Sequence, residues 1–321
     1  MKNTILITGC CGFIGFSLAV KLLENKSNII IGIDNINSYY DPNLKKKRLK
    51  ILNQNKNFVF KKFDIANFSK LSQIFKKNKI IKIFHFAAQA GVQYSLKNPR
   101  AYQNSNVNGY FNLLELSRMY QVRNIYYASS SSVYGDSKIF PVKESFNLYP
   151  KNFYGLSKKI NEEMSEVFAN YYEINITGLR FFTVYGPWGR PDLVILKLID
   201  AFYRKDKFYL NNYGNHFRDF TYVSDVVDII INISNNKNII GNNIFNICSS
   251  NPISLKKLVK IAEKKIGKIN IVKRKFQTGD ILKSYGSNNK IKSYFPKVRF
   301  TEFEIGFKKT LEWYRKFNKI T

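Results

Sequence analysis

Short apolar runs alternate with longer amphipathic stretches through the first half of the chain. The runs are rich in β-branched residues and too short for buried helices, so we predict strands at 5–7, 29–33, 58–60, 80–86 and 124–128. Apolar positions at helical spacing between them predict helices at 13–24, 68–77 and 100–120. Alternation of this kind is typical of βαβ units with right-handed crossovers. We therefore predict an α/β fold with a Rossmann-type, doubly wound parallel sheet.

The pattern changes after a predicted helix at about 152–172 and a strand at 174–180. Gly186-Pro187-Trp188-Gly189 interrupts the chain, and shorter elements follow. We predict one domain at 1–180, with 219–246 returning to it. A smaller C-terminal lobe would contain 181–218 and 247–321.

The last predicted helix begins with Thr301 and Glu304, which have the spacing of a capping box. Four apolar residues then recur on one helical face and predict a buried stripe. They are Phe303, Phe307, Leu311 and Tyr314.

Composition indicates a globular protein, because 45% of the 321 residues are hydrophobic. The three cysteines, two of them adjacent, make a poor disulfide framework and favour a reducing compartment. Neither they nor the two histidines have the spacing of zinc ligands, so we expect no metal site. Glycines interrupt the apolar N-terminal stretch, and no run is long enough to span a bilayer. We expect a cytoplasmic protein with no membrane partner.

A formal charge of +30 raises the possibility of nucleic-acid binding. The lysines are spread along the chain, however, and do not concentrate in one tail. The densest run, Lys45 to Arg48, lies among apolar residues and predicts the solvated face of a helix. We therefore expect no nucleic-acid partner, and an anionic small substrate fits the same charge.

A glycine-rich segment, ITGCCGFIG, joins the first predicted strand to the first helix. Gly9, Gly12 and Gly15 would let the backbone turn tightly and approach a pyrophosphate at the helix N-terminus. Asp34 ends the next strand about 20 positions later, where a carboxylate binds a ribose diol and repels a 2′-phosphate. This arrangement favours NAD over NADP, although Asp34 alone could be a turn residue. Asp64, with Ile65, is a candidate adenine contact or a helix cap.

A second motif, Tyr154 and Lys158, has the spacing that places both side chains on one helical face. A lysine ammonium favours the neighbouring phenolate, which can then remove a hydroxyl proton near neutral pH. The spacing alone is common in a chain rich in both residue types. Here the helix follows a serine run, 129–132, at the carboxyl end of the fifth predicted strand, the edge that faces the cofactor in such folds.

Taken in order, these segments resemble the extended short-chain dehydrogenase/reductases over essentially the whole chain. The similar pieces are TGCCGFIG, HFAAQAGVQYSL, SNVNG, YASSSSVYG, YGLSKK, LRFFTVYGPWGRPD, RDFTYVSDVVD and TGD. More narrowly, DNINSYYDPNLKKKRL and RFFTVYGPWGRPD resemble bacterial UDP-glucuronate 4-epimerases. The resemblance implies an NAD-binding domain, a substrate-binding lobe and 4-epimerisation of a UDP-hexuronic acid through a 4-keto sugar, for polysaccharide biosynthesis.

The resemblance also assigns roles to residues. Tyr154 would be the base and acid, Lys158 would hold the nicotinamide ribose, and Ser130 would bind the reacting hydroxyl. The cofactor-binding set would be Gly9, Gly12, Phe13, Ile14, Gly15, Asp34, Asn35, Asp64, Ile65, Ala87, Ala88, Gln89, Asn106, Tyr154 and Lys158. The substrate-binding set would be Ser130, Ser131, Ser132, Thr183, Arg190, Arg218 and Asp280.

Within the substrate set, the serines and Thr183 match positions that hold the uronate carboxylate, and Arg190, Arg218 and Asp280 match positions that contact UDP. Gln93 replaces an arginine that such epimerases usually have. Serines also replace the Asp-Glu pair of nucleotide-sugar 4,6-dehydratases, which disfavours dehydration because a serine cannot act as the carboxylic acid.

Two alternatives stay open. A 4-epimerase of neutral UDP-hexoses or UDP-N-acetylhexosamines would use the same catalytic groups. A non-enzymatic NAD- or RNA-binding protein would explain the charge but not the Tyr154, Lys158 and Ser130 set. The resemblance implies a homodimer formed through the helices near 100–120 and 152–172.

Overall fold

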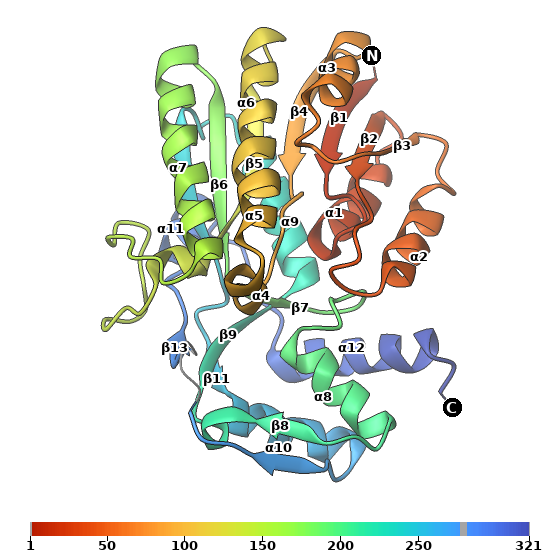
Figure 1. The fold of residues 1–321 in the computed structure, drawn as a ribbon, viewed down its shortest axis with the longest axis vertical. Helices are drawn as coiled ribbons and strands as arrows, with labels where there is room; N and C mark the ends of the chain where they lie inside the picture. The colour runs from red at the N-terminus through yellow and green to blue at the C-terminus, as the bar shows by residue number, and fades with distance from the viewer. Residues whose placement is uncertain (1, 277–280, 321) are drawn as a thin grey trace. The chain divides into compact units, whose positions relative to one another are not determined.

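The computed structural model describes residues 2–276 and 281–320, and Figure 1 follows the chain through them. The chain forms two compact units, each assembled from three stretches of sequence. The first unit comprises the described parts of Met1–Gly135, Asn147–Arg180 and Ile229–Phe245. The second comprises the described parts of Asp136–Phe146, Phe181–Asp228 and Asn246–Thr321.

A seven-stranded sheet forms the centre of the first unit. Its strands are β1 (Asn3–Thr8), β2 (Asn28–Asp34), β3 (Phe58–Lys62), β4 (Ile80–His85), β5 (Asn124–Ser130), β6 (Asn175–Phe181) and β10 (Asn242–Ile247). They follow the order β10-β6-β5-β4-β1-β2-β3. β1 pairs in parallel with β2 and β4, as do β2 with β3 and β4 with β5. The order reverses between β1 and β4, so the prediction of a doubly wound α/β fold is confirmed.

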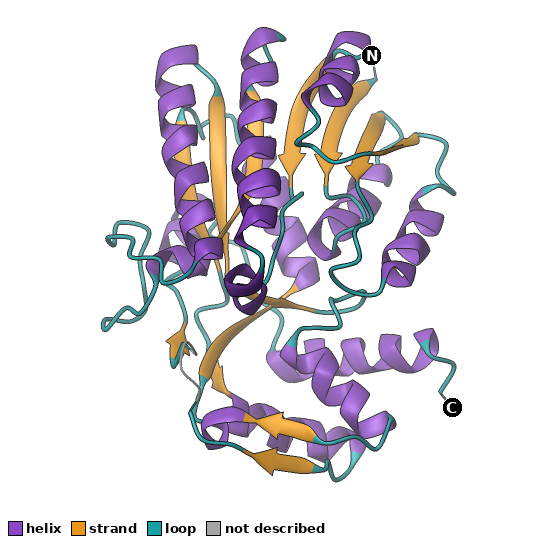
Figure 2. Cartoon of the chain, viewed as in Figure 1, coloured by secondary structure: helices purple, strands orange, loops and turns teal. Residues whose placement is uncertain are grey.

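Helices cover both faces of this sheet (Figure 2). They include α1 (Phe13–Leu23), α2 (Pro42–Leu52), α3 (Phe68–Lys77), α6 (Gly109–Met119) and α7 (Phe153–Tyr172). Right-handed crossovers place α1 and α2 on one face and α3, α6 and α7 on the other. Figure 1 shows α6 and α7 running side by side. Apolar residues of the sheet, such as Leu6 and Ile125, pack against Leu113 of α6 in a continuous buried core.

The helix predicted at 100–120 is interrupted in the structure. It is divided into α5 (Pro99–Tyr102), a π-helical segment (Gln103–Asn108) and α6, with α4 (Val92–Lys97) before it. The side chain of Asn106, in the π-helical segment, bonds to the backbone of Gln89 instead of pointing to solvent. Such bulges are common at functional sites.

The second unit contains smaller sheets and its own core. β9 (Phe217–Tyr222) pairs with β7 (Thr183–Tyr185), β11 (Pro252–Ser254) and β13 (Lys283–Ser284), while β8 (Phe208–Leu210) pairs with β12 (Ile271–Lys273). Its helices are α8 (Val194–Tyr203), α10 (Leu255–Ile266), α11 (Asn289–Tyr294) and α12 (Phe303–Phe317), while α9 (Val223–Asn235) begins in this unit and ends in the first. The predicted apolar stripe of α12 is confirmed, because Phe303, Phe307, Leu311 and Tyr314 are all buried in this unit's core.

The capping box predicted at the start of α12 is wrong. The N-cap residue is Glu302, and it makes no side-chain capping bond. The backbone N–H of Thr301 donates to Asp225 Oδ2 at 2.7 Å, and its hydroxyl donates to Asp225 Oδ1 at 2.8 Å. A distant carboxylate therefore takes both donors of Thr301, which a local motif cannot reveal.

The run from Lys45 to Arg48 lies on α2, but the predicted solvated face is only half right. Lys46 and Lys47 are exposed, whereas Lys45 and Arg48 are buried. Lys45 Nζ donates to the carbonyl and side-chain oxygens of Asn37 at 3.0 and 2.7 Å. The prediction failed because these two cations find polar partners inside the fold. None of the described helices is long and apolar enough to cross a membrane.

Candidate functional site

The glycine loop after β1 packs closely on itself and on the backbone that follows β4. Gly9 has a φ of +71°, and a Cβ atom there would lie 2.5 Å from the backbone nitrogen of Ala87. A Cβ atom at Gly15 would lie 2.3 Å from the carbonyl oxygen of Gly9. Gly12 precedes α1, so the unbonded backbone N–H groups of the first helical turn lie next to this loop. Phe13 and Ile14 begin the helix.

Asp34 lies at the carboxyl end of β2, as the sequence predicts, and faces the glycine loop. Its carboxylate accepts hydrogen bonds from the backbone N–H groups of Cys11 at 3.0 Å and Ile36 at 2.8 Å. Burial raises the pKa of this carboxyl, while those hydrogen bonds and the charges of Lys45 and Arg48 act in the opposite direction. The carboxylate is therefore held by the loop that would bind a pyrophosphate.

Arg48 reinforces the same loop and was missed by the sequence reasoning. Its guanidinium donates to the carbonyl of Cys11 and to the hydroxyl of Tyr40, both at 2.7 Å. Arg48 is fully buried. Arg48 and Cys11 are far apart in the sequence, so no local motif predicts their contact. The sequence shows only a basic residue between apolar ones.

Other predicted cofactor residues are linked in pairs. Asn35 Nδ2 donates to Asp64 Oδ2 at 2.8 Å, which connects the ends of β2 and β3, and Ile65 follows in the buried core. Gln89 N–H donates to Asn106 Oδ1 at 2.7 Å, in the segment that contains Ala87 and Ala88. Asn67, not Asp64, caps α3. The contacts of these residues with a cofactor stay predictions.

The catalytic candidates lie where β5 ends and α7 begins. Ser130 is the last residue of β5, and its Oγ accepts from the N–H of Ser132 at 3.1 Å. Tyr154 and Lys158 lie in the first turns of α7. A Cβ atom at Gly155 would lie 2.6 Å from the carbonyl oxygen of Ser132, so the helix start packs directly on the serine turn. The fold thus brings the serine run and the tyrosine–lysine turn together.

The electrostatics of this turn centre on Lys158, which is buried. Burial lowers the pKa of Lys158 to about 7, while the charge of Glu162 raises it. His85 lies at the end of β4, and burial together with the charge of Lys158 lowers its pKa to about 3. His85 is therefore neutral, and its Nδ1 lies 2.8 Å from the hydroxyl oxygen of Thr8.

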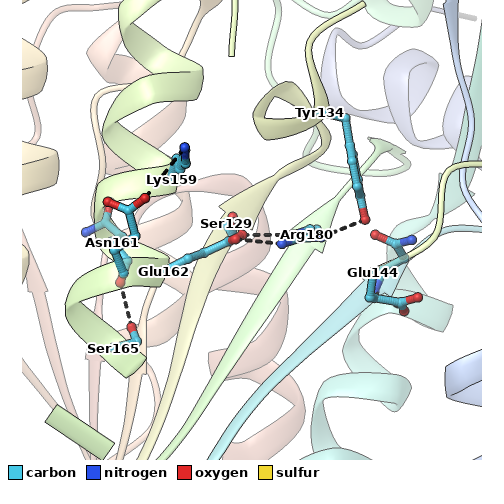
Figure 3. Close-up of polar contacts among 10 residues, drawn as sticks. Ser129, Tyr134, Glu144, Lys159, Asn161, Glu162, Ser165 and Arg180 are labelled. Atoms are coloured by element: carbon cyan, nitrogen blue, oxygen red, sulfur yellow. Dashed lines mark hydrogen bonds and ion pairs between the residues drawn. The ribbon is translucent and has the colours of Figure 1, made fainter. Parts of the chain in front are cut away.

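A buried ion pair behind the catalytic turn was also missed. Glu162 follows Lys158 by one helical turn and pairs with Arg180 of β6 at 2.7 Å (Figure 3). In the sequence, Glu162 follows Lys158 by four residues, the same spacing that separates Tyr154 from Lys158. This regular spacing was the one indication that Glu162 shares their helical face. Nothing in the apolar strand sequence indicated that Arg180 would meet it.

The predicted substrate residues of the second unit lie on or beside its small sheet. Thr183 begins β7 and pairs with Phe220 of β9, two residues from Arg218. Arg190 forms two hydrogen bonds with Asp192, at 2.9 and 2.5 Å. Although burial alone would raise it, these bonds hold the pKa of the Asp192 carboxyl below its ordinary value.

Three further sequence positions lie outside these contacts. Asp219, beside Arg218, directs its carboxylate to Ser249 and Ser250, so it holds a loop. Gln93, the departure from the usual arginine, is exposed on α4. Asp280 lies outside the described residues.

The residues present in the first unit fit a dinucleotide. The glycines keep the loop tight, because a Cβ atom at Gly9 or Gly15 would overlap the protein backbone, and the helix start and Asp34 suit a pyrophosphate and a ribose diol. Among the described residues, no group of three or more His, Cys, Asp or Glu side chains is arranged to hold a metal ion.

Known proteins are similar over nearly the whole chain. The family described as GDP-mannose 4,6 dehydratase matches residues 6–310. An uncharacterized protein of Methanocaldococcus jannaschii is 41% identical over 98% of this chain and 96% of its own. UDP-glucuronate 4-epimerase of Thermodesulfobacterium geofontis is 35% identical, covering 96% and 95%.

A solved structure is also similar over nearly the whole chain. UDP-glucuronic acid 4-epimerase from Bacillus cereus, in complex with UDP-glucuronic acid and NAD, matches with a TM-score of 0.92. It is 28% identical, and the match covers 98% of this chain and 99% of that one.

The doubly wound sheet, the glycine loop after β1 and the tyrosine–lysine turn define a dinucleotide-dependent enzyme. The chain belongs to the GDP-mannose 4,6-dehydratase family of NAD-dependent epimerases and dehydratases.

Proposed function

We propose that this protein is a nucleotide-sugar 4-epimerase that uses NAD to convert UDP-glucuronate into UDP-galacturonate. The observation that carries the proposal is the packing of the tyrosine–lysine turn of α7 on the serine turn after β5. Relatives named UDP-glucuronate 4-epimerase support the substrate, as does the similar structure that contains UDP-glucuronic acid and NAD.

The reaction requires a base that removes a proton from the C4 hydroxyl and later returns it. Tyr154 has this role, and the ammonium of Lys158 favours its phenolate form. Ser130 donates to or accepts from the reacting C4 oxygen and keeps it oriented. When bound, NAD would supply the hydride acceptor and donor for C4. The 4-keto sugar presents its other face, so the hydrogen that returns to C4 inverts this carbon, while Tyr154 returns the proton to the C4 oxygen and no net oxidation results.

The substrate set distinguishes epimerisation from dehydration. Ser131 and Ser132, with Thr183, offer hydroxyl donors to the uronate carboxylate, while Arg190 and Arg218 suit the UDP portion because a guanidinium binds phosphate oxygens with two donors. A dehydratase needs a carboxylic acid that protonates the departing C6 hydroxyl, and serines at 131 and 132 cannot supply it. Asp280 completes the proposed set.

Two broader properties form part of the proposal. The exposed apolar side chains of Phe111, Val167 and Tyr171, on α6 and α7, support a homodimer formed through these helices. A groove of about 600 Å³ on the same face is lined by Phe111 and Met164, among others. The three free, buried cysteines support a cytoplasmic location, where thiols stay reduced. The product would supply a uronate for polysaccharide biosynthesis.

The proposal is tested by NMR assays of the purified protein with UDP-glucuronate, UDP-galactose and UDP-N-acetylglucosamine in separate samples. We expect UDP-glucuronate alone to give its C4 epimer, without a pentose product. Turnover of only a neutral sugar would retain the mechanism and reject the uronate. No reaction with any of them, even with added NAD, would reject the enzymatic function.

A further inference from the structure

The Glu162–Arg180 pair is the most enclosed ion pair of the first unit, with side chains 7% and 4% exposed. Arg180 donates from Nε to Glu162 Oε1 at 2.9 Å and from Nη2 to Oε2 at 2.7 Å. Ser129 Oγ donates to the same Oε1 at 2.5 Å. Figure 3 shows the Glu162 carboxylate pointing from α7 toward Ser129 and Arg180 on the neighbouring strands.

This pair connects the segments that carry the catalytic candidates. Ser129 precedes Ser130 on β5, and Glu162 follows Lys158 by one turn of α7. The remaining arm of Arg180 donates to the hydroxyl of Tyr134 at 2.8 Å, at the end of the serine turn. One carboxylate therefore fixes α7 relative to β5, and its partner fixes the turn that follows.

Stability alone does not account for such a pair. Removing two charges from water costs several kcal/mol, and apolar residues of similar volume often stabilise a core equally well. The position of the pair next to Lys158 suggests a different role. Residues four apart on a helix are neighbours, and an anion in this position attracts the lysine ammonium.

We propose that Glu162 is a positioning residue for the reaction: held by Arg180 and Ser129, its carboxylate favours the charged form of Lys158 and holds it beside Tyr154. The inference rests on the proposed function, in which Lys158 favours the Tyr154 phenolate. It assigns a role to a residue outside the proposed catalytic set, because Glu162 acts through Lys158 and does not contact the substrate.

The other groups near Lys158 leave Glu162 as the anion that acts on it. His85, at the end of β4, is neutral, with a pKa of about 3 caused by burial and by Lys158. Tyr110 of α6 and Tyr127 of β5, on which the charge of Glu162 acts, are also neutral, since burial raises the pKa of both phenols. Burial would lower the pKa of Arg180, but Glu162 raises it above its ordinary value, so the pair stays charged.

The test measures the pKa of Lys158 directly, in protein without added cofactor. Lysines labelled with ¹³C are followed by NMR from pH 5 to pH 10, and the Lys158 signal is the one absent from Lys158→Met. We expect a wild-type pKa of about 7. Glu162→Gln should lower it by at least about one unit, because it removes an opposite charge from a buried neighbour. An unchanged pKa in folded Glu162→Gln would overturn the proposal.

Glu163→Gln is the matched control. Glu163 is the next residue of α7 and pairs with the partly exposed Lys159 at 3.6 Å. This variant should leave the pKa of Lys158 unchanged, while Glu162→Asp, which keeps the charge, should retain most of the wild-type value. An equal shift in Glu163→Gln would overturn the assignment of Glu162.

A double variant, Glu162→Gln with Arg180→Gln, covers the case in which Glu162→Gln fails to fold, because it leaves neither charge unpaired. It should still lower the pKa of Lys158, by less than Glu162→Gln does, because removing the Arg180 cation acts in the opposite direction. Failure of both variants to fold would make the pair a requirement of folding and overturn the positioning role.

Activity separates this inference from the proposed function. If wild-type protein epimerises UDP-glucuronate, the alkaline limb of the kcat/KM profile should move to lower pH in Glu162→Gln and stay in Glu163→Gln. An unmoved limb would reject the role of Glu162 while leaving the epimerase intact. Absence of wild-type turnover would reject the proposed function, and the lysine titration would still report on Glu162.

Discussion

Helix α7 contains two lysine–glutamate pairs with the same spacing, one residue apart in the sequence. The two pairs have the same residue types but differ in burial. Lys158 and Glu162 face the sheet and are buried, whereas Lys159 and Glu163 point outward and are 34% and 62% exposed. A shift of one residue rotates a helical side chain by about 100°. In this helix that rotation separates two solvated charges from two charges held in the protein interior.

The surroundings of a charged side chain on α7, and not its residue type, therefore decide its chemistry. Exposed pairs such as Lys159–Glu163 contribute about 0–1 kcal/mol, because water screens the attraction. The buried Glu162–Arg180 pair has no such screening, and loss of one member leaves an uncompensated charge. The inner face of α7 can therefore carry catalysis, and the charged pair Lys159–Glu163 on the outer face should tolerate substitution.

The largest expected effect is on stability. Arg180→Met leaves the Glu162 carboxylate buried without its partner, and we expect a loss of about 3–5 kcal/mol in the free energy of unfolding. Urea denaturation measures it, with Lys159→Met on the outer face as the control. A loss below about 1 kcal/mol in Arg180→Met would show that water reaches Glu162 and would remove the distinction between the two faces.

The next effect is on turnover. Tyr154→Phe removes the proton carrier, so kcat should fall by about a hundredfold or more while NAD binding is nearly unchanged. Tyr171→Phe is the control, because Tyr171 lies on the same helix and is 80% exposed. Near-normal turnover of Tyr154→Phe in the NMR assay would exclude Tyr154 as the base.

A smaller effect is expected at the glycine loop, where α2 repeats the contrast between buried and exposed charges. Arg48→Met removes the hydrogen bonds to Cys11 and Tyr40, and we expect NAD to bind about tenfold more weakly, as for the loss of one charged hydrogen bond. Lys46→Met, on the exposed face of α2, should bind NAD normally. Titration calorimetry compares the two, and equal affinities would contradict a role for Arg48 in holding the loop.

The smallest effect belongs to the outer face of α7. Glu163→Gln should change the free energy of unfolding by less than about 0.5 kcal/mol, as for other exposed pairs spaced by four residues. Thermal unfolding at low and high salt would detect a larger change. A loss above about 1 kcal/mol would mean that this pair is not solvated as its exposure indicates.

Much of the first unit could be predicted from the sequence because its signals are local. Strand–helix alternation predicts the doubly wound sheet, and the glycine loop with Asp34 has a spacing that chemistry requires. The start of α7 follows Asn152, whose side chain accepts from the N–H of Gly155 at 2.9 Å. Such features depend on neighbours within a few residues.

Partnerships between distant residues could not be predicted. Arg48 meets Cys11, Thr301 meets Asp225 and Arg180 meets Glu162, and each pair is far apart in the sequence or on different elements. A charged residue between apolar ones indicates either a solvated face or a buried pair, and only the fold decides between them. For the same reason, the π-helical segment around Asn106 was absent from the predicted helix.

Deuterium placed at C4 of UDP-glucuronate, with the reaction run in ordinary water, reports directly on how C4 is inverted. We expect UDP-galacturonate that retains the deuterium at C4, because the hydrogen leaves and returns as hydride within one active site while only the hydroxyl proton exchanges through Tyr154. Product that has lost the label to solvent would contradict this mechanism, and formation of no UDP-galacturonate would contradict the proposed function itself.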